Sequence, residues 1–219
     1  MTLAPVTLEG RHVRLVPMER AHLPALWEVA RDEELWRWTW NAVRTPADLE
    51  RYVDAALRLR GEGKALPFVT TEAATGRVIG STRFGSVEPP HPRVEIGWTW
   101  IGRPWQRSPV NTEAKYLMLS HAFGALGCLR VELKTDALNE RSRRALEALP
   151  AQFEGIHRKH MLVRAGENRD SAWHSVLDDE WPEVRANLER RLARVACDGG
   201  ARVDRDEPIP ERGLQNRSA

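Results

Sequence analysis

The segment Arg93–Glu113, with the sequence RVEIGWTWIGRPWQRSPVNTE, is the stretch on which the interpretation of this chain depends. Its first part alternates as strands do, and a short turn then leads directly into a helix. Such a turn directs several backbone N–H groups and the positive end of a helix dipole toward one place. We therefore expect a phosphate or pyrophosphate group to bind there.

The turn contains residue types suited to this task. Ser108 is a good helix N-cap, and Pro109 suits the first helical position. Arg107 adds a full positive charge beside the turn, and Gln106 precedes it. An ordinary capped helix is the alternative interpretation, because such caps are common. The N–H groups that a ligand would use belong to Val110, Asn111 and Thr112.

The strand before the turn contains Gly97, and a glycine there marks a bulge or a place where another group approaches the backbone closely. If this strand separates from its neighbour, its free edge can pair with an extended ligand that carries amide groups. The backbone around Trp98, Thr99 and Trp100 would then follow the ligand, while the turn holds its phosphates. Asn139 and Ser142, on a later helix, are a polar pair that could reach the same groove.

Patterns along the rest of the chain predict one α/β (α+β) domain over residues 1–196. We expect a mixed, mostly antiparallel sheet of about seven strands, separated between the fourth and fifth, with helices on both faces. Few apolar residues follow residue 196, so residues 197–219 are predicted to form a disordered tail. The strands are expected at residues 12–17, 66–71, 78–87, 93–101, 130–135, 152–163 and 169–177, and the helices at 19–31, 45–61, 110–126, 139–149 and 182–195.

The composition excludes several classes of protein. Hydrophobic residues make up 42% of the 219, charged residues 29%, and the formal net charge is only +2. Basic and acidic residues are interleaved, so no nucleic-acid partner is expected. Cys128 and Cys197 lack the spacing of metal ligands, so no metal is expected, and Cys128 is predicted to be a buried thiol. Without a secretion signal or a long apolar run, we expect a cytoplasmic protein with no membrane partner.

Several motifs together resemble the GNAT superfamily of acyl-CoA-dependent N-acyltransferases. They are the strand EIGW before the turn, NTEAK at the start of the helix, and NERSRRALEAL with FEG after it, in the expected order of elements. The similarity covers roughly Leu8 to Leu192. Within the superfamily, the chain resembles the branch that includes ribosomal-protein N-terminal acetyltransferases.

The resemblance implies that acetyl-CoA, a co-substrate, lies across the turn and the separated strands. The family's turn pattern, Q/R-x-x-G-x-G/A, falls on Gln106, Pro109 and Asn111, so both small residues are replaced. Pro109 removes one N–H donor, which alters the expected pyrophosphate geometry. Asn139 and Ser142 match the family's N-x-x-S, which places Asn139 at the pantetheine arm and Ser142 near the thiol. Asn139 is also suited to capping its own helix.

Acylation of an amine also requires a base and an oxyanion donor. Glu95 is the candidate base, because it lies on the strand that should flank the thioester; a salt bridge is the alternative. A backbone N–H of Trp98 or Thr99 could stabilise the oxyanion, and Ser142 could supply a proton to the departing thiolate. His157 and His160 could face the acceptor channel, although surface positions are common for such histidines.

Trp36, Trp38 and Trp40 lie where the family forms its acceptor site, and they are predicted to line an aromatic pocket. Packing or a dimer contact would explain them equally well, and dimers are frequent in the family. The sequence thus favours an N-acetyltransferase acting on a primary amine, which could be a protein N-terminus, by direct transfer in a ternary complex. A non-catalytic acyl-CoA-binding module is the main alternative, and a single-strand nucleic-acid module built on exposed tryptophans is the third.

Overall fold

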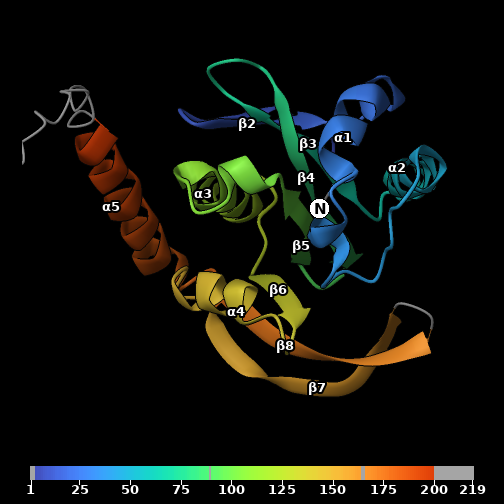
Figure 1. Cartoon of the computed structure of the whole chain (residues 1–219). Helices are drawn as coiled ribbons and strands as arrows, with labels where there is room; N and C mark the ends of the chain where they lie inside the picture. The colour runs from blue at the N-terminus through green and yellow to red at the C-terminus, as the bar shows by residue number, and fades with distance from the viewer. Residues whose placement is uncertain (1–2, 89, 164–165, 200–219) are drawn as a thin grey trace, which may run out of the picture.

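The computed structural model describes residues 3–88, 90–163 and 166–199, and it places their strands in one sheet (Figure 1). The strands are β1 (Leu8–Glu9), β2 (Val13–Pro17), β3 (Leu66–Glu72), β4 (Val78–Glu88), β5 (Arg93–Ile101), β6 (Arg130–Asp136), β7 (Gln152–Val163) and β8 (Glu167–Leu177). The helices are α1 (Leu23–Ala30), α2 (Pro46–Gly61), α3 (Pro109–Gly124), α4 (Glu140–Glu147) and α5 (Trp181–Gly199). Short 3₁₀ helices form at Arg20–His22, Glu33–Trp36 and Arg103–Trp105.

The eight strands of the described residues are arranged in the order β1-β2-β3-β4-β5-β6-β8-β7. All neighbouring strands are antiparallel except β5 and β6, which are parallel. The expected mixed, mostly antiparallel sheet is therefore confirmed. The additional strand is β1, whose two residues are too few to produce a recognisable pattern.

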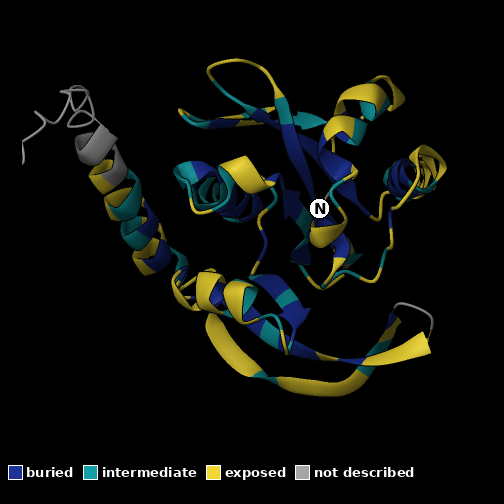
Figure 2. Ribbon diagram, viewed as in Figure 1, coloured by how far each residue is buried: buried dark blue, intermediate teal, exposed yellow. Residues whose placement is uncertain are grey.

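Helices cover both faces of the sheet, as predicted. Helices α1 and α2 lie on one side and α3 on the other, with α5 packed beyond α3 (Figure 1). An apolar cluster fills each interface; Met118 belongs to the one under α3, and Val53 to the one under α2. The strands between these helices are buried, whereas β7 is exposed along most of its length (Figure 2).

Local sequence signals account for the helix starts. The Thr45 side chain caps the Asp48 N–H while the Asp48 carboxylate accepts from the Thr45 N–H, and Pro46 is the first helical residue. Ser108 and Pro109 take the same N-cap and first helical positions in α3, where the Ser108 hydroxyl accepts from the Val110 N–H and no acidic side chain in the first turn returns a bond. Both helices therefore begin where the sequence predicts.

Strands β5 and β6 separate after a short parallel stretch. Their pairing consists of Arg93 with Arg130, Val94 with Val131, and Glu95 with Glu132, although β5 continues to Ile101 and β6 to Asp136. The separation between the fourth and fifth predicted strands is therefore confirmed. The gap it opens lies directly before the start of α3, which is where the site forms.

The C-terminal boundary differs from the prediction. Helix α5 continues to Gly199, so residues 197–199 extend the helix instead of starting a tail. The remainder of the predicted tail, residues 200–219, lies outside the described residues. Within the described part of the chain, no helix is both long and apolar enough to cross a bilayer.

Candidate active site

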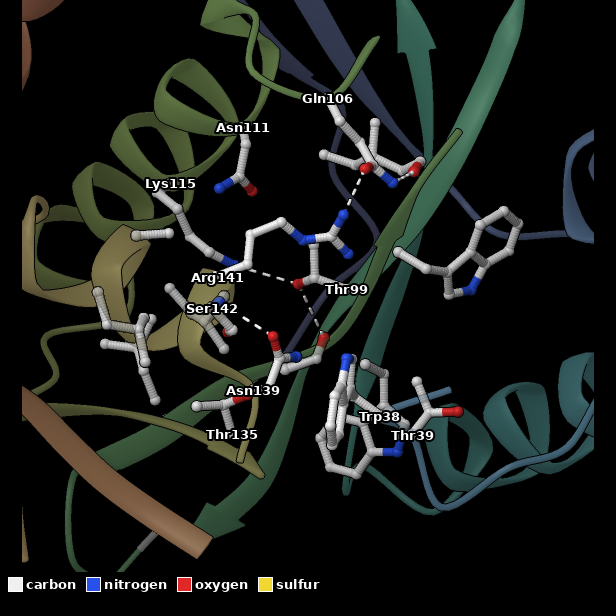
Figure 3. A pocket seen from close by; sticks show the side chains of 18 of the residues that line it. Trp38, Thr39, Thr99, Gln106, Asn111, Lys115, Thr135, Asn139, Arg141 and Ser142 are labelled. Atoms are coloured by element: carbon white, nitrogen blue, oxygen red, sulfur yellow. Dashed lines mark hydrogen bonds between the residues drawn. The ribbon is translucent and has the colours of Figure 1, made fainter. Parts of the chain in front are cut away.

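A cavity of about 760 Å³ opens where β5 and β6 separate. Its walls come from β5, the first turns of α3 and α4, and the segment between α1 and α2. Side chains from these distant parts of the sequence converge on one opening, including Asn111 and Lys115 from α3 and Asn139 and Ser142 at the start of α4 (Figure 3). Trp38 and Thr39 lie toward the lower end of this view.

The start of α3 forms one end of the cavity. The Ser108 hydroxyl donates to the Trp105 carbonyl at 2.6 Å and accepts from the Val110 N–H at 3.4 Å. Val110 does not line the cavity within the described residues, because its side chain packs into the core. The first four N–H positions of a helix lack intrahelical partners, and Pro109 has no N–H. Asn111 and Thr112, which do line the cavity, are therefore the amides best placed for a ligand.

Gln106 ties this turn to two other elements. Its amide nitrogen donates to the Ile101 carbonyl at 2.8 Å, and its amide oxygen accepts from the Arg141 guanidinium at 2.7 Å. Both ends of the side chain thus have protein partners, so Gln106 holds the turn, the end of β5 and the start of α4 together. Five arginines also line the cavity, an arrangement that favours a ligand with several phosphate charges. They are Arg107, Arg141, Arg144, Arg169 and Arg191.

Asn139 and Ser142 lie together on the α4 side. The Asn139 side-chain oxygen accepts from the Ser142 backbone N–H at 3.1 Å, which makes Asn139 the N-cap of α4. Both residues also line the cavity. Since capping uses only the amide oxygen, the amide nitrogen of Asn139 stays available as a donor toward a ligand.

A β-bulge shapes the β5 wall. Ser81 pairs with Trp100 and Arg83 with Gly97, so Trp98 and Thr99 together oppose one residue of β4. Trp98 has a φ of 51°, which a bulge of this kind requires. The predicted bulge beside Gly97 is thus present, and Trp98, Thr99 and Trp100 all line the cavity. The interrupted ladder leaves backbone groups free at the cavity wall.

Glu95 lies where the two strands begin to part. Its side chain is 3% exposed, and one carboxylate oxygen accepts from the Ser86 hydroxyl at 2.9 Å and from the Lys134 ammonium at 2.8 Å. A Cβ atom on Gly97 would lie 2.7 Å from the other oxygen, so glycine makes room for this carboxylate. Glu95 therefore forms the salt bridge of the alternative interpretation and also lines the cavity.

Lys115 lines the same cavity and was absent from the sequence-based list of site residues. Its ammonium donates to the Thr99 hydroxyl at 3.1 Å, and that hydroxyl lies 2.8 Å from the hydroxyl of Thr82. Burial lowers the pKa of Lys115 to about 8. One signal could have revealed it: a lysine inside a mostly apolar helix, one turn after Asn111 and so on the same helix face.

The three clustered tryptophans meet at the other end of the cavity. Trp36, Trp38 and Trp40 all line it, together with Tyr52. Trp36 is also part of the core, since its indole N–H donates to the Ala30 carbonyl at 2.7 Å and its ring lies 5.4 Å from that of Trp100. Trp40 is 47% exposed at the rim. Trp36 thus packs in the core as well as lining the cavity, and the acceptor-binding role of the three rings stays a prediction.

His160 is placed differently from the expectation. Met161, the next residue on β7, lines the cavity, whereas His160 does not, because neighbouring strand residues point to opposite faces. The Nδ1 atom of His160 lies 3.0 Å from the Ser171 hydroxyl, and its ring meets Trp173 edge-on at 5.6 Å. Burial, followed by the charge of Lys134, lowers the pKa of His160, so its ring is neutral near physiological pH.

Comparisons with known proteins agree with this architecture. Residues 12–152 match the acetyltransferase (GNAT) domain family. A GCN5-related N-acetyltransferase from Brucella melitensis superimposes with a TM-score of 0.80 at 33% identity, over 87% of this chain and 86% of its own. A protein of T. thermophilus, provisionally described as an acetyltransferase, superimposes with a TM-score of 0.79 at 41% identity, over 88% of this chain and all of its own.

Three further comparisons are more limited. Mycobacterium smegmatis RimJ in complex with CoA-disulfide shares the fold at a TM-score of 0.72 and 22% identity, over 89% of this chain and 95% of its own. The uncharacterized N-acetyltransferase YoaA of Bacillus subtilis is 33% identical over 87 residues, which are 40% of this chain and 49% of YoaA. A Bacillus licheniformis relative matches similarly, so the chain spans about half the length of the curated relatives it matches.

The chain belongs to the GNAT acetyltransferase family, whose members take the acetyl group from acetyl-CoA. The donor set of the cavity fits that co-substrate: helix amides and arginines at one end, and a parted strand with free backbone groups beside them. No group of His, Cys, Asp and Glu side chains in the described residues could hold a metal ion.

Proposed function

We propose that this chain transfers an acetyl group from acetyl-CoA to a primary amine, by direct transfer in a ternary complex. The observation that carries the proposal is the continuity of the cavity. One space of about 760 Å³ connects the basic start of α3, the parted strands and the aromatic end. Donor and acceptor would therefore bind at the same time, with the thioester at the junction.

Residues at the basic end would hold the donor. The amides of Asn111 and Thr112 would accept its diphosphate, with Arg107 and Arg141 neutralising the remaining charge. Asn139 would donate its amide nitrogen to the pantetheine arm. The backbone of β5 from Trp98 to Trp100 would pair with the arm's amides, as one strand pairs with another.

Glu95 is the proposed base at the junction. Its carboxylate is held by Ser86 and Lys134, and it would accept the proton that the attacking amine releases. A backbone N–H at the bulge, from Trp98 or Thr99, would stabilise the oxyanion. Ser142 lies on the opposite wall and would donate a hydrogen bond to the sulfur.

Direct transfer is supported by the state of Cys128. This thiol is buried outside the cavity, and burial raises its pKa to about 11, so it is a poor candidate for a covalent acyl carrier. The acceptor would contact Trp36, Trp38 and Trp40. These rings suit an amine attached to an apolar or aromatic group, such as the N-terminus of a protein.

The test is a calorimetric titration with acetyl-CoA, followed by a screen of amines for thiol release. We expect binding in the micromolar range and turnover with at least one amine. A charge-reversal variant, Arg141→Glu, should weaken binding, whereas Arg158→Glu on exposed β7 is the matched control and should not. Failure of acetyl-CoA to bind at millimolar concentration would contradict the proposal. Binding without turnover on any amine would instead identify an acyl-CoA-binding module.

A further inference from the structure

Two lysines with different surroundings line the cavity, of which Lys115 is buried and Lys134 is partly buried. The Lys134 ammonium pairs with the Glu95 carboxylate at 2.8 Å and also lies 4.9 Å from the centre of the Trp173 ring. Lys115 has neither kind of partner in the described residues; its one contact is the Thr99 hydroxyl at 3.1 Å. Lys115 is only 8% exposed, so water does little to replace the missing partners of its ammonium.

A buried ammonium of this kind lowers the stability of the folded protein. A buried cation without a counter-charge loses hydration and gains little in return. It has three N–H donors, of which Thr99 uses one, so two donors have no hydrogen-bond partner among the described residues. An apolar residue at this position would pack against the core without that cost. The retained charge therefore indicates a partner that is negative, or becomes negative, inside the cavity.

The position of Lys115 indicates which negative group this is. Lys115 lies one helical turn beyond Asn111, which is at the phosphate-binding end. Its ammonium contacts Thr99, which is one of the two residues of the bulge. The ammonium therefore lies beyond the diphosphate end and at the level where β5 would hold the reactive end of the donor.

We propose that Lys115 acts on the leaving sulfur: its ammonium stabilises the thiolate of coenzyme A as the acetyl group departs, and gives that thiolate a proton. This inference rests on the proposed acetyltransferase function. It assigns to a side chain of α3 the acid role in the same reaction in which Glu95 is the base.

The proton balance closes. The amine nitrogen forms a bond to the carbonyl carbon, the carbon–sulfur bond breaks, and its electron pair remains on sulfur. Lys115 transfers one proton to that sulfur and becomes a neutral amine. The nitrogen releases one proton to Glu95, and this proton returns through solvent to Lys115 after the products leave. No oxidant, metal or further reactant is required.

Lys115 is better matched to this task than the hydroxyl of Ser142. Burial brings the pKa of Lys115 to about 8, close to the value of about 8.5 for an ordinary thiol, so the transfer is nearly balanced. A serine hydroxyl is a far weaker acid than a thiol and can orient the sulfur without protonating it. Only four of the 33 basic residues of the chain are lysines, and the others are arginines. An arginine does not lose its proton in proteins, so it could not donate one to the sulfur.

The test measures the ionisation of bound coenzyme A, which requires no acceptor. The thiolate is followed by ultraviolet difference absorbance as the pH is raised in the complex with free CoA. We expect the apparent thiol pKa in the wild-type complex to be lower by about one unit or more than in the Lys115→Met complex. Equal values in the two complexes overturn the proposal.

Lys115→Arg separates charge from proton donation. It keeps the cation, so the bound thiol pKa should stay low, but turnover with an identified amine should fall roughly a hundredfold. Lys64→Met, at an exposed site that does not line the cavity, is the control and should change neither quantity. A Lys115→Arg variant with wild-type turnover would show that the proton comes from elsewhere.

The outcomes separate the two proposals. If CoA does not bind to the wild-type protein, the acetyltransferase proposal itself fails. If CoA binds and its thiol pKa is indifferent to Lys115, the donor site stands and only the role of this lysine is removed. Melting temperatures of both variants, measured without ligand, establish that each protein is folded.

Discussion

Helix α3 carries two buried charges, Glu113 and Lys115, that face two different regions of the molecule. Glu113 faces the N-terminal strands, and its carboxylate accepts the backbone N–H groups of Arg11, His12 and Val13 at 2.9, 2.6 and 2.8 Å. Lys115 faces the cavity, and its ammonium contacts one hydroxyl. The two residues are 6% and 8% exposed, so burial does not distinguish them.

The difference lies in how completely each charge is paired. Three N–H donors hold the carboxylate in the folded protein, so Glu113 fastens the start of β2 to α3. Lys115 lacks comparable partners in the described residues, so its charge destabilises the protein without ligand and is free to act on one. Glu95 is intermediate, since its buried carboxylate has one cation and one hydroxyl and still lines the cavity.

The largest effect is expected for Glu113→Ala. Removing the carboxylate leaves three backbone N–H groups without their acceptor, and the bonds to a charged group are lost as well. We expect a loss of about 4 kcal/mol in the free energy of unfolding, measured by urea denaturation. Glu113→Gln keeps one acceptor oxygen and should lose about half as much. A loss below about 1 kcal/mol for Glu113→Ala would show that the contrast with Lys115 is not one of pairing.

Helix α3 also shows what the sequence can and cannot predict. Ser108–Pro109 and Thr45–Pro46 follow local rules, so both helix starts were predictable to the residue. The parted strands and the bulge beside Gly97 were predictable because a glycine and the family motifs mark them. The sequence marks Lys115 only as an unusual lysine inside a mostly apolar helix. It was missed because its importance depends on which carboxylates are absent from its surroundings, and no local pattern reports that absence.

The same limit explains the other differences. His160 was expected at the acceptor site, but the facing of residues on β7 depends on its register with β8, which shifts between His157 and Met161. Strand β1 is too short for a pattern, and α5 continues past the composition change at Cys197. The homodimer and the cytoplasmic location stay predictions, because a single chain tests neither.

Glu95→Gln tests the intermediate case. We expect turnover with an identified amine to fall roughly a hundredfold near neutral pH, equivalent to about 2.7 kcal/mol, with little change in acetyl-CoA affinity. The deficit should shrink as the pH rises, because the acceptor then loses its proton to solvent. Stopped-time assays across a pH series provide the measurement. Unchanged rates at low pH would remove Glu95 as the base and leave it as the ion-pair partner of Lys134.

Lys115→Met should stabilise the protein without ligand, in contrast to Glu113→Ala. The pKa of Lys115 falls from 10.5 in the unfolded chain to about 8 in the folded protein, so the unfolded chain binds the proton more tightly. Below pH 8 this difference lowers the free energy of unfolding of the wild type by on the order of 3 kcal/mol. Lys115→Met removes that cost but also removes the hydrogen bond to Thr99, which is worth about 1 kcal/mol.

The pH dependence of stability tests whether Lys115→Met is more stable than the wild type for the reason given. Between about pH 8 and 10.5 the unfolded wild type binds more protons than the folded form, so wild-type stability rises with pH relative to Lys115→Met. The advantage of the variant should thus be about 2 kcal/mol at pH 7 and disappear toward pH 10.5. Urea denaturation at several pH values measures it. A variant less stable than the wild type at pH 7 would mean that Lys115 serves the fold.

The smallest effect is expected at Asn139, where one side chain is both a helix cap and a proposed ligand donor. Its oxygen caps Ser142 at 3.1 Å, and its nitrogen is the proposed donor to the pantetheine arm. Asn139→Ser keeps a capping oxygen and removes that nitrogen, so stability should stay within a few tenths of a kcal/mol while CoA binding weakens severalfold. Asn139→Ala removes both, so it should also lose about 1 kcal/mol of stability. Calorimetry and urea denaturation on the two variants separate the roles. If Asn139→Ser binds CoA as tightly as the wild type, Asn139 is a fully used structural group like Glu113, and the donor end of the cavity depends on α3 alone.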